Sequence, residues 1–154
     1  MIGITAIVVC YNEARRLSES LKSLSFCDEI LVFDMGSTDG SLEIATRYAT
    51  KVISIPRVEY LESILPDLIK HTKNKWVISQ DPDEVFSSKL AEQLEQILEI
   101  HPEIAKFEVP LKFYFMEKPL TGTIWGGDKF KGRVFNKEHV NVSPLVVSHA
   151  EMDG

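Results

Sequence analysis

The chain has 154 residues, which favours a single domain, and 44% of them are hydrophobic, which is enough apolar material for a core. Its formal net charge is −6 and it carries no dense stripe of lysine and arginine, so we expect no nucleic-acid partner. No apolar stretch approaches the roughly 18 residues that a membrane-spanning helix needs. The two cysteines, Cys10 and Cys27, form neither a metal-type motif nor a disulfide framework, so we expect a soluble protein in a reducing, cytoplasmic compartment.

Residues 4–100 alternate between strand-like and helix-like stretches. The strand-like stretches are short apolar runs rich in β-branched residues, typical of strands buried on both faces of a parallel sheet. The helix-like stretches space their apolar side chains three and four residues apart. We predict strands over Ile4–Cys10, Glu29–Phe33, Lys51–Ile55 and Trp76–Ser79, helices capped by Asn12 and by Ser87 or Ser88, a helix over Ser41–Tyr48, and a helix over Tyr60–His71 that Pro66 kinks or interrupts.

This order of elements predicts an α/β fold, with right-handed βαβ units, a mainly parallel sheet and helices on both of its faces. Ligands of such sheets bind at the carboxyl ends of the strands. Three of the loops that follow strands are rich in polar side chains: Tyr11–Glu13, Asp34–Gly40 and Asp81–Glu84. We expect these loops to lie on one edge and to form the functional site.

The pattern changes after Pro102. The segments Lys106–Met116, Lys129–Phe135 and Val140–Val147 are predicted to be strands of a smaller, antiparallel part that completes one side of the cleft. The chain then ends without a closing element, so we expect a truncated or short member of its class.

The loop after the fourth strand has the sequence Asp-Pro-Asp-Glu. The carboxylates of Asp81 and Asp83 can both face one cation if the chain bends between them, and hard oxygen ligands suit Mg²⁺ or Mn²⁺. An acidic protein needs such an ion, or local cations, to bind a diphosphate. The simpler alternative is an acidic turn ahead of a helix, whose first turn favours carboxylates.

The other two loops offer contacts for a nucleoside. Asp34 ends a strand, where its carboxylate could accept hydrogen bonds from a base N–H or a ribose hydroxyl, while Tyr11 offers a ring face and Glu13 a further acceptor. Helix capping is the alternative role for these loops, and for Thr38 and Asp39 it is the one we favour.

Together, the segments Ala6–Glu13, Ile30–Gly40 and Trp76–Glu84 resemble the family 2 glycosyltransferases in order and spacing. The resemblance covers residues 4–100 and implies a GT-A, Rossmann-like fold and inverting transfer from a nucleoside-diphosphate sugar. It also implies that Asp34 and Glu13 contact the nucleoside and that Asp81 and Asp83 are the D-x-D metal ligands.

The Asp-Pro-Asp-Glu form is similar to a bacterial subgroup whose members build lipopolysaccharide core and other surface glycans. The resemblance therefore implies a UDP-sugar donor, a glycan or lipid-linked acceptor, and a role in cell-envelope polysaccharide synthesis. The location that follows is the cytoplasm, at the inner face of the membrane, with peripheral membrane association through other segments or partners.

Inverting transfer needs a general base for the acceptor hydroxyl. The resemblance points to Asp128, with Glu117 in reserve, although Asp128 could also be a simple turn residue. Arg133 could brace the diphosphate or be a solvated strand charge. His149 could contact metal or phosphate or be structural, and Trp125 could stack on an acceptor sugar or pack in the fold.

The sequence departs from the family pattern between the third and fourth strands, where many relatives carry Arg or Lys near Asn. Arg57 is the one arginine close to this stretch, and we assign it the nucleotide contact. We expect one GT-A domain over residues 1–154, in which residues 1–100 form the nucleotide-binding half and residues 101–154 a partial acceptor-side half.

Two other functions compete with the transferase. A catalytically silent GT-A module would bind nucleotide, or serve as an interaction platform, without a working base. A nucleotidyltransferase with a related sheet would carry a glycine- and lysine-rich phosphate loop after the first strand, but residues 10–16 contain no glycine.

Overall fold

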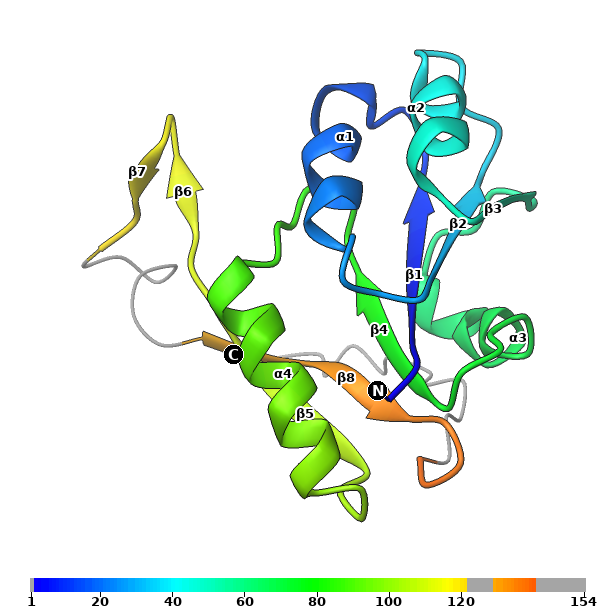
Figure 1. Ribbon diagram of the computed structural model, residues 1–154. Coiled ribbons are helices and arrows are strands. Elements are labelled where there is room, and N and C mark those ends of the chain that lie inside the picture. Colours follow the sequence, from blue (N-terminus) through cyan, green and yellow to red (C-terminus); the bar gives the residue numbers. More distant parts are fainter. Residues whose placement is uncertain (1, 122–128, 141–154) are drawn as a thin grey trace, which may run out of the picture.

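A six-stranded sheet forms the centre of the protein in the computed structural model, which describes residues 2–121 and 129–140 (Figure 1). The strands of this sheet lie in the order β3-β2-β1-β4-β8-β5. Their bounds are β1 Ile4–Cys10, β2 Glu29–Asp34, β3 Lys51–Ser54, β4 Trp76–Gln80, β5 Lys106–Leu111 and β8 Lys129–Asn136. Strands β1 to β4 pair in parallel, and β8 runs antiparallel to both β4 and β5. The predicted α/β fold with a mainly parallel sheet is confirmed.

The other elements are four α-helices, one 3₁₀ turn and a short hairpin within the described residues. Their bounds are α1 Ala14–Ser23, α2 Ser41–Tyr48, the 3₁₀ turn Leu61–Ser63, α3 Leu65–Ile69, α4 Ser88–Ile100, β6 Tyr114–Phe115 and β7 Lys118–Pro119. In the described part of the chain, no helix is long and apolar enough to cross a membrane.

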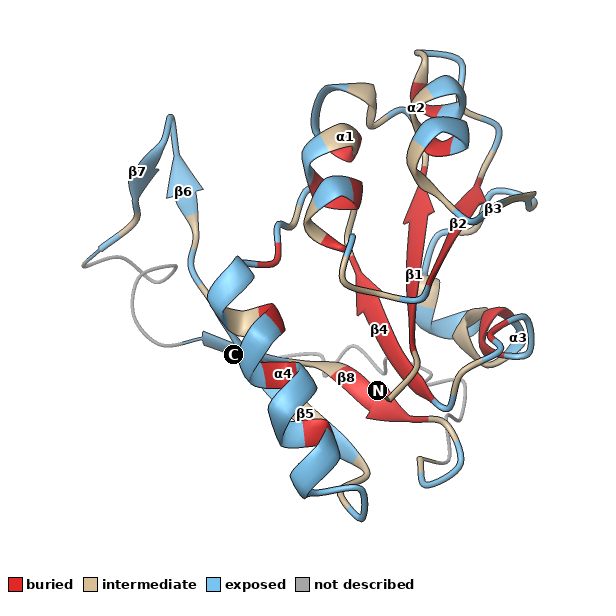
Figure 2. Cartoon of the chain, in the orientation of Figure 1, coloured by how far each residue is buried: buried red, intermediate tan, exposed pale blue. Residues whose placement is uncertain are grey.

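Two hydrophobic cores lie on the two faces of the sheet. Alternate residues of a strand point to opposite faces, so β1 contributes Ala6 and Val8 to one core and Ile7 and Val9 to the other. The first core packs against α1, α2 and α4, and the second packs against α3. Figure 2 shows the central strands fully buried between these layers. Helices therefore cover both faces, as the sequence predicts.

The register of the strands places three loops on one edge. Cys10 pairs with Asp34, and Val8 pairs with Gln80, so β1, β2 and β4 end side by side. Strand β8 runs the opposite way, and Val134 pairs with Ile78 near the end of β4. The first half of β8 therefore lies beside the loop that follows Gln80.

Two predicted elements are interrupted. The helix predicted over residues 60–71 is a 3₁₀ turn followed by the short α3, with Pro66 in the first turn of α3, where proline is tolerated because no helical hydrogen bond is lost. The strand predicted over residues 106–116 ends at Leu111, after which the chain enters the β6–β7 hairpin. The strand predicted over residues 140–147 lies outside the described residues, apart from Val140.

The capping role predicted for Asn12 is wrong, whereas that of Ser87 is confirmed. Asn12 has a positive φ of 55° and lies before Glu13, the residue at which α1 is capped without a side-chain hydrogen bond. The Oγ of Ser87 accepts a hydrogen bond from the backbone N–H of Leu90, at 3.2 Å.

Candidate active site

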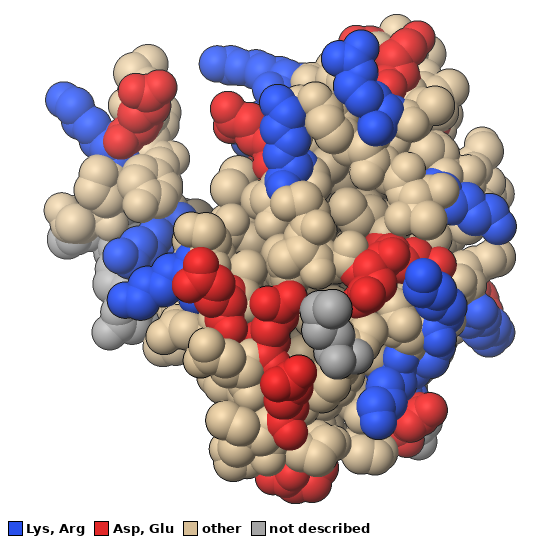
Figure 3. Space-filling model, viewed as in Figure 1, with Lys and Arg blue, Asp and Glu red and all other residues tan. Residues whose placement is uncertain are grey.

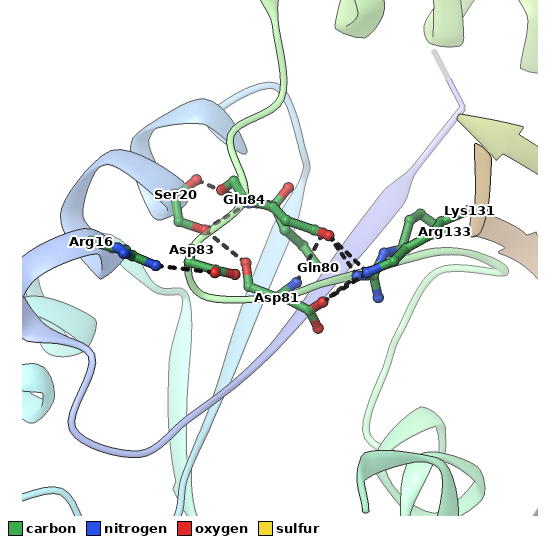
Figure 4. Close-up of polar contacts among 8 residues, drawn as sticks. All are labelled: Arg16, Ser20, Gln80, Asp81, Asp83, Glu84, Lys131 and Arg133. Atoms are coloured by element: carbon green, nitrogen blue, oxygen red, sulfur yellow. Dashed lines mark hydrogen bonds and ion pairs between the residues drawn. The ribbon is translucent and has the colours of Figure 1, made fainter. Parts of the chain in front are cut away.

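The loop after β4 is held against α1 by buried hydrogen bonds. The Nε2 of Gln80, whose side chain is buried, donates to Ser20 Oγ at 2.7 Å and to the carbonyl of Glu84 at 3.0 Å. The N–H of Phe86 donates to Ser23 Oγ at 3.0 Å. These contacts hold both ends of the loop. Figure 4 shows those that Gln80 makes with Ser20 and Glu84.

Two carboxylates of this loop face two cations on β8. Asp81 Oδ2 accepts from Arg133 Nη2 and lies 3.4 Å from Lys131 Nζ. Glu84 Oε1 lies 2.7 Å from Arg133 Nη2 and 3.3 Å from Lys131 Nζ. Lys131 and Arg133 both reach the loop from β8, whose pairing with β5 shifts register between Lys131 and Val134. The loop and the strand therefore form a compact four-membered ionic cluster.

The third carboxylate of the loop turns the other way. Asp83 Oδ2 lies 3.2 Å from Arg16 Nη1 on α1, and both side chains are half-exposed. Figure 4 shows Asp81 and Asp83 directed to opposite sides of the loop. The predicted convergence of these two carboxylates on one cation is therefore not seen here, and the described residues contain no group of three or more His, Cys, Asp or Glu side chains that could hold a metal ion.

Arg133 is a largely buried cation, not a solvated strand charge. Its side chain is 13% exposed. Burial disfavours the charged guanidinium, but the carboxylates of Asp81 and Glu84 outweigh that cost and raise the pKa of Arg133 above its ordinary value. Its contacts with the loop go through Nη2, and its buried Nε has no hydrogen-bond partner among the described residues.

An open cleft of about 820 Å³ adjoins the loop and extends to the β6–β7 hairpin. Asp81, Asp83 and Lys131 line its charged side, and Phe113, Tyr114 and other apolar side chains line the wall opposite. Figure 3 shows the hairpin standing off the body of the protein across a gap. The cleft is large enough for a ligand that contacts both the ionic cluster and the hairpin.

Glu117, the reserve candidate for the general base, lines this cleft together with Asp81 and Asp83. It forms the hairpin turn with Met116, and both residues have positive φ angles, 64° and 47°. Such angles are uncommon for residues other than glycine, although two-residue hairpin turns require them. Glu117 is thus held at the mouth of the cleft by the turn itself.

On the neighbouring strand, Asp34 organises the second loop. Its carboxylate is buried and accepts hydrogen bonds from the N–H groups of Gly36 and Ser37, each at 3.1 Å to Oδ2. Gly36 has a φ of 81°, an angle that glycine adopts without the steric cost of a side chain. Asp34 lies at the predicted edge, and part of its hydrogen-bonding capacity is used by its own loop.

The first loop brings two predicted substrate contacts together. The Arg57 guanidinium carbon lies 4.0 Å from the centroid of the Tyr11 ring, a cation–π arrangement. Asn12 Oδ1 accepts from the N–H of Thr38 at 2.8 Å, and Ser41 Oγ accepts from the N–H of Glu13 at 2.8 Å. The loops after β1 and β2 are therefore joined to each other, beside the ionic cluster at the end of β4.

The sequence profile described as glycosyl transferase family 2 matches residues 5–143. The chain belongs to this family. Among its relatives, a glycosyltransferase of Rickettsia felis is 30% identical over 121 residues, which are 77% of this chain and 42% of the relative. The lipopolysaccharide core biosynthesis glycosyltransferase LpsC of Rhizobium meliloti is 26% identical over 120 residues, 75% of this chain and 44% of LpsC. The chain thus spans less than half the length of these family 2 relatives.

Solved structures show the same fold. S. aureus TarS (residues 1–349) has a TM-score of 0.57 and 21% identity, over 66% of this chain and 33% of TarS. The mannosyltransferase PcManGT from Pyrobaculum calidifontis, solved with GDP-Man and Mn²⁺, has a TM-score of 0.55 and 23% identity, over 67% of this chain and 34% of the other. The predicted GT-A fold of family 2 is confirmed.

Three predicted site residues, Asp128, Trp125 and His149, lie outside the described residues. Sequence reasoning missed Lys131, Glu84 and Arg16 as members of the ionic cluster or its surroundings. Lys131 could have been found because it lies two residues from Arg133 in the same predicted strand. The sequence gives no signal that Arg16 on α1 reaches Asp83, since the two are 67 residues apart.

Proposed function

We propose that this family 2 chain transfers a sugar, with inversion, from a nucleoside-diphosphate sugar to a glycan or lipid-linked acceptor. One observation carries the proposal: the Asp81–Glu84 loop ends a central parallel strand at the ligand-binding edge, beside the cations Arg133 and Lys131. Acidic and basic groups together on such an edge suit a ligand that carries a metal-bound diphosphate.

The nucleoside would lie over the ends of β1 and β2. Tyr11 offers a ring face whose position is supported by Arg57, and Asp34 keeps a carboxylate at the strand end. Glu13 follows β1, as Tyr11 does, and is half-buried. A UDP-sugar is the proposed donor, which is supported by the structure of TarS with UDP, at a TM-score of 0.54. PcManGT was solved with GDP-Man, so a guanosine donor is the alternative that the binding experiment below also tests.

Mn²⁺ or Mg²⁺ is the proposed cofactor. Carboxylate oxygens from Asp81 and Asp83 are the hard ligands that these ions prefer, and the ions commonly complete their shell with water and substrate phosphate. The donor chemistry fits, although each carboxylate has a side-chain cation as its partner in this structure. A bound ion would neutralise charge on the departing diphosphate. His149 remains a proposed further contact.

The acceptor would enter the cleft between the loop and the β6–β7 hairpin. Asp128 remains the proposed general base, and Glu117 at the mouth of the cleft is the reserve. The apolar wall formed by Phe113, Tyr114 and Met116 would suit a sugar ring face or a lipid-linked acceptor. The similarity to LpsC supports a place in cell-envelope polysaccharide synthesis at the inner face of the membrane.

Calorimetry with UDP and Mn²⁺ tests the donor site. The wild-type chain should bind UDP more tightly when Mn²⁺ is present, and replacing both Asp81→Asn and Asp83→Asn should abolish that gain. Asp67→Asn is a matched control because Asp67 is an exposed carboxylate paired with Lys70 on α3, away from the proposed site. The same titration with GDP would establish which nucleoside is preferred.

If the doubly substituted chain keeps its metal-dependent affinity, the proposed metal ligands are wrong. Donor hydrolysis then separates an enzyme from a silent module: slow release of sugar from a UDP-sugar is expected, with loss of that release in Asp128→Asn. Full turnover by Asp128→Asn would transfer the role of base to Glu117, which Glu117→Gln would test in turn.

A further inference from the structure

The ionic cluster at the end of β4 is electrically balanced without any ligand. Its two carboxylates, Asp81 and Glu84, face the two cations Lys131 and Arg133. On the other side of the same loop, Asp83 pairs with Arg16. The formal charges of these groups sum to zero (−3 and +3). In this structure the cations therefore neutralise the carboxylates, as a bound metal ion would.

Adding only one component of the proposed ligand would upset this balance. A divalent ion alone would leave these groups at +2 and would compete with Lys131 and Arg133 for Asp81. A doubly charged, sugar-linked diphosphate alone would leave it at −2, next to three carboxylates. Only when both bind does the sum return to zero, and in a partly buried cluster an unbalanced charge is costly.

One donor of Arg133 makes no hydrogen bond within the described part of the chain. Its side chain is 13% exposed, and its Nε is buried without a partner among the described residues. A guanidinium that turns from a carboxylate to a phosphate oxygen keeps a charge-assisted hydrogen bond. Lys131 Nζ lies at 3.4 Å and 3.3 Å from its two carboxylate partners and is 45% exposed, so it is loosely held.

Resting on the proposed function, we propose that Lys131 and Arg133 are internal counter-ions of Asp81 that transfer to the donor diphosphate when a divalent ion takes the carboxylates of Asp81 and Asp83. Lys131 is thereby a diphosphate-binding residue. The exchange couples the two ligands: metal and nucleoside diphosphate each bind weakly alone and tightly together.

The test is to titrate Lys131→Gln with Mn²⁺ alone, followed by the electron paramagnetic resonance signal of free Mn²⁺, and with UDP in the presence of Mn²⁺, followed by calorimetry. Removing the competing cation should strengthen the binding of Mn²⁺ alone by about two- to fivefold, the equivalent of one exposed ion pair. Removing a diphosphate contact should weaken the binding of UDP with Mn²⁺ by a similar factor.

Lys129→Gln is the matched control. Lys129 lies on the same strand and the same face, two residues from Lys131, and it is exposed and has no ion pair among the described residues. Both substitutions remove one positive charge, so a general electrostatic effect would move both variants equally, whereas counter-ion exchange should move only Lys131→Gln.

Equal behaviour of the two variants would overturn the inference, as would wild-type binding of Mn²⁺ that is equally tight with and without UDP. A failure of the counter-ion exchange can be distinguished from a failure of the proposed donor site. If Asp81→Asn with Asp83→Asn abolishes metal-dependent binding but Lys131→Gln matches its control, the donor site stands and the exchange does not. If the aspartate variant binds as the wild type does, the site itself is wrong.

Discussion

At the scale of single residues, the candidate site is built from side chains that also hold the fold together. Asp34 fastens its own turn through the N–H groups of Gly36 and Ser37 while lying at the end of a central strand. Arg133 is buried against Glu84 and against Asp81, which is one of the two proposed metal ligands. Substitutions here affect binding and stability together, so conservative replacements such as Asp→Asn are the informative ones.

Cys10 gives a test of the burial at this edge. Burial, with a contribution from the nearby Asp34 carboxylate, raises the pKa of the Cys10 thiol from its ordinary 9.0 to about 12. Burial and the acidic neighbours Asp28 and Glu95 also raise the pKa of Cys27. Both thiols should therefore react slowly with 5,5′-dithiobis(2-nitrobenzoate) at pH 8 in the native chain. The chain unfolded in guanidinium chloride should react far faster.

The sign of the pH effect follows from the same shift. The folded state favours the protonated Cys10 thiol, so its contribution to stability is complete below pH 9 and is lost as the pH rises from 9.0 to about 12. Cys10→Ser should reduce this alkaline loss of stability in urea titrations. Rapid labelling of Cys10 in the native chain at pH 8 would contradict the buried environment described here.

At the scale of elements, Asp39 joins the starts of two helices. Its Oδ2 accepts from the N–H of Ala14 at 2.9 Å, at the start of α1, and its Oδ1 accepts from the N–H of Ser41 at 3.0 Å, at the start of α2. Asp39 is therefore not the N-cap residue of α2, which is Gly40, but its carboxylate accepts from N–H groups at the starts of both helices. A single carboxylate here fixes the relative position of the loops after β1 and β2.

Asp39→Ala should destabilise the protein more than Asp39→Asn, because Asn keeps an acceptor oxygen for the helix starts. Hydrogen bonds from the Ser41 hydroxyl and the Ala14 N–H lower the pKa of Asp39. Its charge therefore adds stability above the ordinary aspartate pKa, and that stability is lost as the pH falls through the lowered value. Urea unfolding of the wild type, Asp39→Asn and Asp39→Ala at a series of acidic pH values measures this loss of stability. If Asp39→Asn and the wild type lose stability equally as the pH falls, the carboxylate does not contribute as described.

Helix α4 seals the first core over β4 and β8, the two strands that carry the ionic cluster. Leu98 is fully buried in that core. Leu98→Ala should therefore cost about 2–5 kcal/mol of unfolding free energy. Ile97, the preceding residue of the same helix, is 38% exposed, so Ile97→Ala should cost about 1 kcal/mol or less. Urea titration of both variants compares them, and equal losses would show that α4 does not pack as described.

At the scale of the whole molecule, the sequence predicted the parallel half of the fold closely. The bounds of β1 and α2 were predicted to the residue, because an uninterrupted apolar run and a glycine-flanked amphipathic stretch are strong local signals. The helix over residues 60–71 and the strand over residues 106–116 were predicted too long, because local patterns do not show where tertiary packing breaks an element.

The candidate site was predictable in its location but not in its ion pairs. That the loops after β1, β2 and β4 share an edge follows from parallel strand order, which the alternation of elements implies. That Lys131 and Arg133 meet Asp81 and Glu84 depends on β8 entering the sheet antiparallel to β4, from about 50 residues further along the chain, and on its register. Local sequence patterns predict neither the direction nor the register of β8.

The most direct test of the donor site is paramagnetic broadening by Mn²⁺, measured in amide ¹H–¹⁵N spectra of the chain with saturating UDP. If Mn²⁺ binds at the end of β4, the signals of Asp81, Asp83 and Glu84 should broaden beyond detection at the lowest Mn²⁺ concentrations. Those of the neighbouring loop Tyr11–Glu13 should follow as more Mn²⁺ is added. The signals of Asp28 and Lys73, at the opposite edge of the sheet, should persist. Broadening centred on that opposite edge, or none at all with both ligands present, would contradict a donor site at the end of β4.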